Sequence, residues 1–364
     1  MKDNQTNPAK PLNLLLIGAG GQGTRRARAT QLSKGWKLAG VFDNNQELAA
    51  EMARKWRCRH FSDATQAISA DTIDVVAIAT PPASHDDYII KSIHSGRHVI
   101  CEKPLTIFPQ LAIDYLKEAD QKNLIIATGF NHRFYKPVIN ASELLRSNTI
   151  GRLIEINGRI GQRPEESVLN GWMGNCLLSG GGAIVDNGSH LIDLAMLFLD
   201  SNISAELIDC ISIQDRSGID EHTELRLTDS HGLQANLKAS WNEPEEPYLK
   251  LEIKAESGLI RISAFPWRLE LDKPGHKTIS KQYLFDRITM KGLGFLANGL
   301  EMSLVHEMQS IRQSILKLNQ VRMKHATGSD GQRIAELIEE LKNQAGLSEQ
   351  KMIKPEQLLK LQRA

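Results

Sequence analysis

Residues 12–43 decide the fold of this chain; they read LNLLLIGAGGQGTRRARATQLSKGWKLAGVFD. The apolar run Leu12–Ile17 predicts a strand that is buried on both faces, and the glycine-rich turn Gly18–Gly23 leads into a helical pattern. A second apolar run, Lys37–Phe42, ends at Asp43. This order of strand, glycine turn, helix, strand and acid is typical of a βαβ unit that binds a dinucleotide.

The turn has the spacing Gly18-x-Gly20-x-x-Gly23, and each glycine has a physical task. The three tasks are a tight turn, a close approach of the backbone to a pyrophosphate, and close packing of helix on strand. Backbone N–H groups and the positive end of the helix dipole would meet the phosphates. The alternative is a structural turn followed by an ordinary surface aspartate. We expect a cofactor to contact Gly18, Gly20, Gly21, Gln22, Gly23 and Asp43.

Asp43 also distinguishes between the two nicotinamide cofactors. A carboxylate at this place accepts hydrogen bonds from both ribose hydroxyls, and it would repel the 2′-phosphate of NADP. Asn44 and Asn45 follow it rather than a cation. Arg25 and Arg26, early in the first helix, are nearby cations that would favour the 2′-phosphate of NADP. The sequence predicts NAD, with NADP as the less favoured cofactor.

Apolar runs and helical patterns continue to alternate from Asp43 to about Phe130. This alternation predicts an α/β domain over residues 12–130, a Rossmann domain with a doubly wound parallel sheet. The further strands are expected at Asp74–Thr80, His98–Cys101 and Leu124–Thr128. The helices are expected at Thr24–Ser33, Gln46–Trp56, Ala83–Ser95 and Pro109–Gln121.

The pattern changes after about Asn131, where short alternating segments follow one another without intervening helices. Such runs favour an open, mainly antiparallel sheet, so residues 131–344 are predicted to form a C-terminal α+β domain. Its strands are expected at Leu153–Arg159, Glu206–Gln214, Thr223–Thr228, Leu233–Trp241, Leu249–Ala255 and Leu259–Ser263. Its helices are expected at Val138–Ser147, within Ser179–Asp200 after a Gly-Gly-Gly entry, at Ala297–Leu318 and at Asp330–Gln344, before a polar tail at residues 345–364.

The composition argues against several classes of function. The chain has 44 basic and 43 acidic residues, which gives no electrostatic reason to expect nucleic acid or an anionic membrane surface as a partner. No stretch approaches the roughly 18 apolar residues that a membrane span needs. The four cysteines are far apart and form no CxxC pair, so we expect no metal site, no disulfide framework and a reducing cytoplasm as the compartment.

Two polar segments follow predicted strands, at the edge of a parallel sheet where ligands bind. Thr80-Pro81-Pro82 stands at the end of the run Asp74–Thr80, with His85 shortly beyond it, and Glu102-Lys103-Pro104 comes after the next run. Lys103 could be a surface lysine in a strand-to-helix connection, or a cation that orients a substrate oxygen beside the nicotinamide. We expect Thr80, Pro81, His85, Glu102 and Lys103 to contact the cofactor.

Asp186, His190 and Asp193 have the spacing i, i+4, i+7, which places them on one face of a regular helix. This pattern could be a polar stripe on a half-buried helix. A chemical role is the other interpretation, because oxidation of a secondary alcohol needs a base for the hydroxyl proton. The unperturbed pKa of histidine lies near neutrality, and a neighbouring carboxylate can orient the ring.

The motifs occur in an order that resembles the glucose–fructose oxidoreductase / inositol dehydrogenase / rhizopine-catabolism (Gfo/Idh/MocA) family of NAD(P)-dependent oxidoreductases. Beyond the glycine turn and Asp43, they are Thr80-Pro-Pro-x-x-His85, Glu102-Lys103-Pro104, Gly129-Phe-Asn-His-Arg133-Phe134 and Gly180-Gly-Gly-Ala-Ile-Val-Asp186-Asn-Gly-Ser-His190-Leu-Ile-Asp193. The resemblance covers about Leu12 to Gln344. It implies a Rossmann domain, a C-terminal domain with a large open sheet, and a homodimer or homotetramer formed through that sheet.

The resemblance also implies roles for individual residues. His190 would transfer the proton, Asp186 would assist it and contact the substrate, and Lys103 would orient the reacting oxygen. Arg133 matches a position that often faces the substrate, although a salt bridge between the two domains is the other interpretation. Trp172 is followed by Met173, where related sequences often carry arginine, so the substrate is hard to infer by analogy. His132 and Trp241 could line the cleft or serve packing.

Three functions are compatible with these features. The first is NAD(P)-dependent dehydrogenation or reduction of a sugar, cyclitol or sugar derivative, a small-molecule polyol substrate. The second is a non-catalytic NAD-binding sensor or regulator on the same scaffold, which would have no need of Lys103, Asp186 and His190 together. The third is glycoside hydrolysis in which NAD is reduced and regenerated within one turnover.

Overall fold

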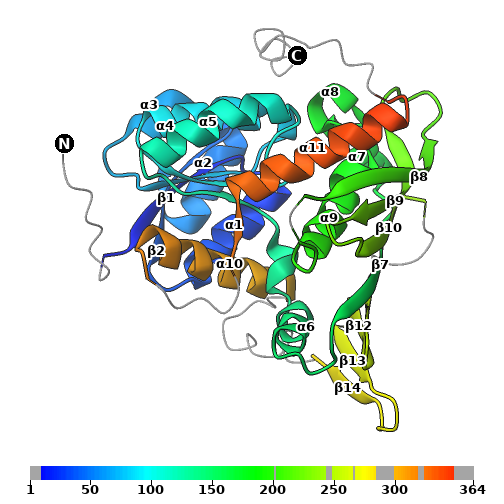
Figure 1. Ribbon diagram of the computed structural model, residues 1–364. Helices are drawn as coiled ribbons and strands as arrows, with labels where there is room; N and C mark the ends of the chain where they lie inside the picture. The colour runs from blue at the N-terminus through cyan, green and yellow to red at the C-terminus, as the bar shows by residue number, and fades with distance from the viewer. Residues whose placement is uncertain are drawn as a thin grey trace. The chain divides into compact units, whose positions relative to one another are not determined.

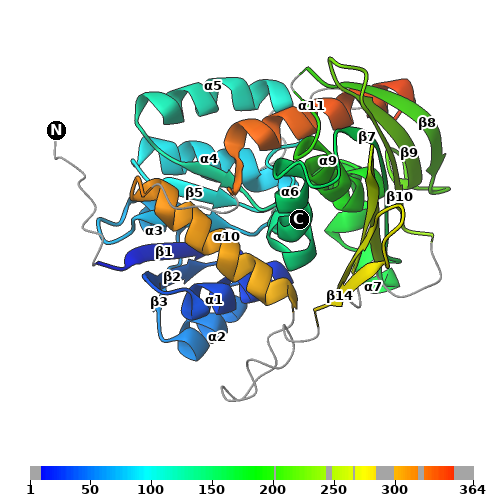
Figure 2. The ribbon, with the colours of Figure 1, turned by 60° about the horizontal axis from the view of Figure 1, so that its bottom comes forward.

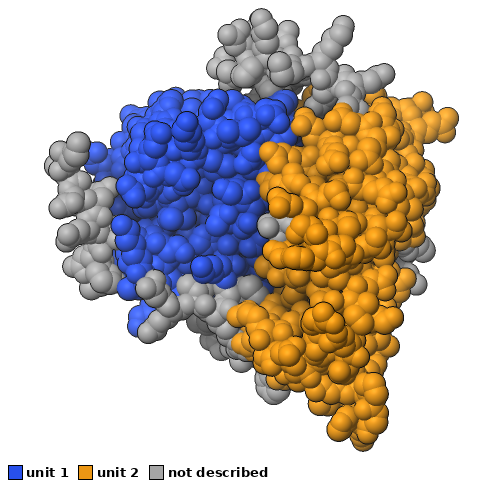
Figure 3. All heavy atoms as spheres, in the orientation of Figure 1, with its two compact units in different colours: residues 1–134, 295–332 blue, residues 135–294, 333–364 orange. Residues whose placement is uncertain are grey.

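The structure, a computed structural model, describes residues 10–200, 202–242, 248–264, 267–283, 299–318 and 324–347. The chain divides into two compact units, each built on one sheet (Figure 3). Unit 1 comprises Met1–Phe134 and Phe295–Gln332, and unit 2 comprises Tyr135–Gly294 and Arg333–Ala364. The predicted tail from residue 348 onward and the first two residues of the helix predicted at Ala297–Leu318 lie outside the described residues.

The sheet of unit 1 has the strand order β15-β6-β5-β4-β1-β2-β3, and Figure 2 shows β1, β2 and β3 in this sheet. Its strands are parallel except β15, which pairs antiparallel with β6. The order reverses between β1 and β4, which is the switch point where open α/β sheets bind ligands. The strands are β1 Leu12–Ile17, β2 Trp36–Phe42, β3 Arg59–His60, β4 Val75–Ile78, β5 His98–Cys101, β6 Ile126–Thr128 and β15 Ala326–Thr327.

Alternate residues of β1 belong to two different cores, which explains the four consecutive apolar residues Leu14–Ile17. Leu15 and Ile17 lie in a core with buried residues of three helices, α3 Ala64–Ser69, α4 His85–His94 and α5 Pro109–Gln121. Leu14 and Leu16 lie in a second core, which contains buried residues of α1 Gly21–Leu32, α2 Gln46–Trp56 and α10 Gly299–Ile315. The prediction of a doubly wound parallel sheet is therefore confirmed. Two short 3-10 turns, η1 Pro82–Ser84 and η2 Asn131–Phe134, complete the helical elements of this unit.

Helix α10 packs on unit 1, although it follows the strands of unit 2 in the sequence. Its buried side chains Leu304, Met308 and Ile311 belong to the core that also contains residues of α1. Figure 2 shows α10 running beside α1. Residues 295–332, which we expected in the C-terminal domain, thus group with the Rossmann fold. The physical reason is the apolar face of α10, whose partners are provided by the first third of the chain.

The sheet of unit 2 has the order β14-β13-β12-β11-β7-β10-β9-β8. Only β7 and β10 pair parallel, so the prediction of a mainly antiparallel open sheet is confirmed. The sequence did not predict β13 and β14. The strands are β7 Leu153–Gly161, β8 Ser204–Ser212, β9 Asp220–Thr228, β10 Gln234–Ser240, β11 Tyr248–Ala255, β12 Gly258–Ala264, β13 Arg268–Asp272 and β14 Ile279–Gln282.

One face of this sheet is apolar, as the buried alternate residues Leu249, Leu251 and Ile253 of β11 show, and Figure 1 shows the helix α9 beside the sheet. A β-carbon on Gly158 of β7 would lie 3.3 Å from Leu191 of α9, so glycine allows helix and sheet to pack closely. The other helical elements of the unit are α6 Lys136–Arg146, α7 Glu166–Leu169, η3 Trp172–Gly174, α8 Cys176–Ser179, the π-helix η4 Ile184–Gly188 and α9 Ser189–Met196, together with α11 Gly328–Gln344 from Arg333 onward. Among the described residues, no helix is long and apolar enough to cross a membrane.

Candidate functional site

The glycine turn between β1 and α1 has two kinds of glycine. A β-carbon on Gly18, which has a φ of +98°, would lie 2.5 Å from the carbonyl oxygen of Ala79, and one on Gly23 would lie 2.0 Å from the carbonyl oxygen of Gly18. These two positions accept no side chain. Gly20 and Gly21, at the start of α1, have no atom within 4 Å of such a β-carbon. The space beside these two glycines is therefore open, which leaves room for a pyrophosphate to approach the backbone.

Asp43, at the end of β2, is anchored to this turn. Its Oδ2 accepts a hydrogen bond from the N–H of Ala19 at 2.6 Å, and its Oδ1 accepts from the N–H of Asn45 at 2.8 Å. Each carboxylate oxygen can accept a second hydrogen bond. The arrangement therefore holds the acid next to the glycine turn and leaves it able to accept ribose hydroxyls.

Arg26 is unavailable to a cofactor phosphate. Its guanidinium is 1% exposed and lies 2.6 Å from both Glu102 and Glu307. Arg25, its neighbour, is exposed on α1. One of the two cations that would favour NADP is thus already paired with the carboxylates of Glu102 and Glu307.

His85 is completely buried at the start of α4 and contacts both strand-end segments. Its Nδ1 lies 2.8 Å from the carbonyl oxygen of Pro104, and its Nε2 lies 2.9 Å from that of Thr80. Burial lowers the pKa of His85, while the two carbonyls raise it in part. We predicted that His85 contacts the cofactor; the observed contacts are with the backbone of Thr80 and Pro104, which the ring holds together.

Lys103 and Glu102 follow β5 and are both partly buried. Oε1 of Glu102 accepts two hydrogen bonds from Arg26, at 2.6 Å and 3.3 Å. Lys103 precedes a cis peptide bond to Pro104. Burial and, secondly, the ammonium of Lys103 lower the pKa of His132 to about 3. His132 is therefore a neutral, half-buried ring beside the lysine.

A second buried acid, Asp86, lies next to His85, and the sequence did not suggest it. Its oxygens accept hydrogen bonds from Thr106 at 2.8 Å and from Tyr115 at 3.0 Å. Burial raises the pKa of Asp86 to about 7, although these two hydrogen bonds oppose the change. Asp86 thereby ties α4 to the segment after Lys103.

Arg133 is buried in η2, and its Nη1 lies 3.3 Å from Oδ2 of Asp330. Both residues belong to unit 1. The ion pair therefore lies within unit 1, with Asp330 in the first turn of α11, the helix that continues into unit 2 at Arg333. A contact with substrate stays a prediction.

Asp186 and His190 belong to unit 2, in the successive elements η4 and α9. Oδ2 of Asp186 accepts a hydrogen bond from the indole N–H of Trp241 at 3.1 Å, so Trp241 holds the acid in place. His190 is 7% exposed, and Asp193 is fully buried. Because η4 is a π-helix, Asp186 lies in a wider turn than the regular helix that we expected, and π turns recur at functional sites.

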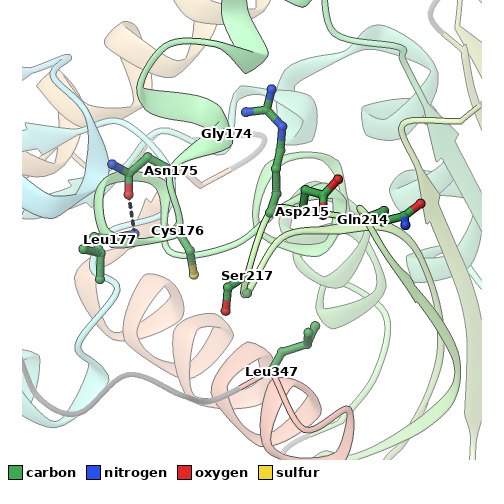
Figure 4. Close-up of a pocket in the computed structure, with 10 residues that line it drawn as sticks. Gly174, Asn175, Cys176, Leu177, Gln214, Asp215, Ser217 and Leu347 are labelled. Atoms are coloured by element: carbon green, nitrogen blue, oxygen red, sulfur yellow. Dashed lines mark hydrogen bonds between the residues drawn. The ribbon is translucent and has the colours of Figure 1, made fainter.

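Unit 2 also contains a cavity of about 680 Å³ (Figure 4). It lies between the loop after β8, with Asp215 and Ser217, and the segment that leads into α8, with Asn175 and Cys176. None of the predicted site residues lines it. Among the described residues, no group of three or more histidine, cysteine or acidic side chains is placed to hold a metal ion.

Two parts of the chain match family models. Residues 12–130 match the model described as "Oxidoreductase family, NAD-binding Rossmann fold", and residues 138–261 match the model described as "GFO/IDH/MocA C-terminal domain". The first model covers the glycine turn and Asp43, and the second covers Asp186 and His190.

The chain is also similar to curated proteins. It is 29% identical over 203 residues to D-glucoside 3-dehydrogenase of Escherichia coli, and the matched region covers 55% of this chain and 56% of that protein. It is 28% identical over 200 residues to glucose-6-phosphate 3-dehydrogenase of Bacillus subtilis, which covers 53% and 55%. The chain thus spans about half the length of the curated relatives that it matches.

The fold is shared with a solved structure of levoglucosan dehydrogenase in complex with NADH and levoglucosan. The TM-score is 0.80 at 23% identity, and the match covers 93% of this chain and 98% of that chain. The two family models identify the chain as a member of the Gfo/Idh/MocA oxidoreductase family, with that family's NAD-binding Rossmann domain.

Proposed function

We propose that this protein is an NAD-dependent dehydrogenase or reductase that acts on a secondary hydroxyl or keto group of a sugar or sugar derivative. One observation carries the proposal: the carboxylate of Asp43 is bonded to the N–H of Ala19 inside the glycine turn. A ribose acid and a phosphate-binding turn are thus joined at the switch point of the sheet. Family membership supplies the class of reaction.

The names of the relatives support a more specific substrate. Two of them are dehydrogenases that act on the 3-position of a glucoside or a glucose phosphate. We propose a pyranose as the substrate, with the C3 hydroxyl as the group that is oxidised. Such a substrate presents several hydroxyls that need polar partners, and these come from lysine, aspartate and histidine side chains more readily than from an apolar pocket.

Three residues are proposed to act on the substrate. His190 removes the hydroxyl proton, Asp186 orients it and binds a neighbouring hydroxyl, and Lys103 holds the reacting oxygen. NAD, when bound, would supply the hydride acceptor, and His190 would take the hydroxyl proton, so that the alcohol would become a ketone. In the reductive direction, His190 returns the proton. Arg133 is proposed to bind a further substrate hydroxyl.

The remaining proposals concern the cofactor, assembly and compartment. The buried pairing of Arg26 supports NAD over NADP, because it removes a cation from the approach of a 2′-phosphate. We propose a homodimer or homotetramer formed through the sheet of unit 2, by likeness to the family. A cytoplasmic location is proposed because all four cysteines belong to the described residues and none forms a disulfide.

The absorbance of NADH, followed with a panel of pyranosides, sugar phosphates and cyclitols, tests this function. Net NADH formation with a pyranoside, and formation of the 3-keto sugar in the product, is the expected result. Hydrolysis of a glycoside without net NADH would instead establish the redox-assisted glycosidase. NAD binding without turnover across the panel would favour a sensor.

A further inference from the structure

We propose that Asp220, at the start of β9, is a positioning residue for the acid–base pair Asp186 and His190. The proposal rests on the proposed function for its catalytic consequence. Its structural part rests on hydrogen bonds within unit 2 alone. Asp220 lies more than twenty residues beyond the helix that it contacts, and the sequence pattern did not single it out.

The carboxylate of Asp220 caps the beginning of the segment that carries Asp186. Its Oδ1 accepts from the N–H of Gly182 and its Oδ2 from the N–H of Ile184, both at 2.9 Å. Oδ2 also accepts from the hydroxyl of Thr223 at 2.8 Å. The first N–H groups of a helix have no partner within the helix, and a carboxylate there also interacts favourably with the helix dipole.

This carboxylate is completely buried, with 0% of its residue surface exposed. Burial raises the pKa of Asp220, whereas its three hydrogen bonds lower it. The buried carboxylate of Asp220 accepts hydrogen bonds from three donors. Its orientation is fixed, because any rotation would leave a buried donor without an acceptor. Gly182 allows this closeness, because a β-carbon there would lie 1.9 Å from the carbonyl oxygen of Asp220.

The start of β9 reaches Asp186 by a second route. The carbonyl oxygen of Glu221, the residue after Asp220, accepts from the N–H of Trp241 at 2.7 Å. The indole of Trp241 in turn donates to the carboxylate of Asp186 at 3.1 Å. Two sets of hydrogen bonds therefore position Asp186. The carboxylate of Asp220 holds the backbone before it, at Gly182 and Ile184, and the indole of Trp241 holds its side chain. Both sets lead to the first two residues of β9, Asp220 and Glu221.

This arrangement has a consequence for catalysis. A displacement of about 1 Å between a reacting group and its substrate lowers a rate by about 100-fold. Asp220→Asn keeps the size of the side chain but replaces one acceptor oxygen by an NH₂ group that faces an N–H or O–H donor. We therefore expect Asp220→Asn to lower kcat by about 10- to 100-fold, with the Kd for NAD unchanged.

Asp229 provides the matched control. It too is a buried aspartate that accepts backbone N–H groups, from His231 and Leu233 at 2.9 Å and from Asp200 at 3.1 Å. It lies in the turn after β9. Asp229→Asn therefore removes the same charge and the same kind of hydrogen bond, but its donors are the backbone groups of Asp200, His231 and Leu233 rather than those of Gly182 and Ile184.

The indole N–H resonance of Trp241 gives a readout that does not depend on activity. Trp241→Phe assigns its peak in the ¹H–¹⁵N spectrum of the full chain. We expect Asp220→Asn to move this peak and to lower kcat, and Asp229→Asn to do neither. An unmoved peak in Asp220→Asn overturns the proposal, and so does a moved peak with a kcat equal to that of Asp229→Asn.

Failure of the proposed function and failure of the positioning role of Asp220 give different results. If the wild-type protein turns over no substrate, the proposed function fails, but the Trp241 peak still decides whether Asp220 positions Asp186. If Asp220→Asn does not fold, Thr223→Val removes one donor from the same carboxylate. We expect it to move the Trp241 peak by a smaller amount, and an unmoved peak there would overturn the proposal.

Discussion

The guanidinium of Arg26 lies 2.6 Å from the carboxylate of Glu102, and the two side chains join the first helix of the Rossmann fold to the segment that carries Lys103. The same guanidinium lies 2.6 Å from Glu307 of α10, whose side chain is completely buried. One cation thus connects three segments that are far apart in the sequence. It also explains why α10 belongs to unit 1.

Loss of Arg26 should destabilise this unit strongly. Arg26→Met leaves two carboxylates buried near one another without their cation, and breaking such a buried pair costs about 3–5 kcal/mol. Urea unfolding measures the change in the free energy of unfolding. Arg25→Met, an exposed neighbour on the same helix, is the control and should change it by less than about 0.5 kcal/mol. Equal effects of the two substitutions would contradict this assignment.

The carboxylate of Asp43 should govern cofactor affinity and choice. Asp43→Asn removes the charge that would accept the ribose hydroxyls, and hydrogen bonds to charged groups are worth about 1.5–3 kcal/mol. Calorimetric titration should therefore show NAD binding weakened by about 10- to 100-fold, with NADP affected less because a 2′-phosphate is no longer repelled. An unchanged ratio of the two affinities would argue against a ribose role for Asp43.

His190 should be needed for turnover and dispensable for cofactor binding. A positioned general base contributes about 100- to 10,000-fold to the rate, so His190→Ala should lower kcat by that factor. The Kd for NAD should stay the same, because the glycine turn and Asp43 lie in the other unit. His231→Ala, at an exposed histidine, is the control. Wild-type kcat in His190→Ala would remove this residue from the mechanism.

The buried acid Asp86 should make stability depend on pH in a direction unusual for an aspartate. Burial raises its pKa to about 7 from the ordinary 3.8. The folded chain therefore binds this proton more tightly than the unfolded chain does. Binding of this proton stabilises the folded state. The stabilisation is complete below about pH 4 and is lost as the pH rises through about 7. Its size is about 4 kcal/mol, at roughly 1.4 kcal/mol for each pKa unit.

Unfolding of Asp86→Asn at several pH values checks this. The difference in free energy of unfolding between wild type and variant should change by about 4 kcal/mol between pH 4 and pH 8, in favour of the variant at high pH. The difference isolates Asp86 from buried histidines such as His98, whose pKa burial lowers to about 4 and which act in the opposite direction. Asp87→Asn, at a half-exposed neighbour paired with Lys91, should leave the pH dependence unchanged. A parallel pH dependence in wild type and Asp86→Asn would refute the prediction.

Local patterns predicted the elements of the first unit closely. The bounds of β1, α2 and α5 agree with those expected from the positions of apolar residues. The strand β3 is two residues long and both of its side chains are exposed, so it has no periodicity that a sequence could show. The strand β14 is likewise exposed at every position. Such strands exist because a neighbouring edge offers hydrogen bonds, which a sequence does not display.

Some residues of the candidate site could likewise be predicted from the sequence, and others could not. The glycine turn, Asp43, Asp186 and His190 are singled out by residue type and spacing, because their chemistry depends on local backbone geometry. The roles of Arg26, Asp86, Trp241 and Asp220 depend on partners between about 20 and about 280 residues away in the sequence. No local pattern marks such partners.

The sequence by itself determined the βαβ unit, its phosphate turn and its acid, because glycine spacing and a doubly buried strand are local properties of the chain. Only the tertiary structure decided that α10 returns to the first sheet, that Arg26 is occupied by Glu102 and Glu307, and that Asp186 lies in a π turn held from β9. These features arise where segments distant in sequence bury one another's polar groups, and the cost of leaving such groups unpaired selects one arrangement.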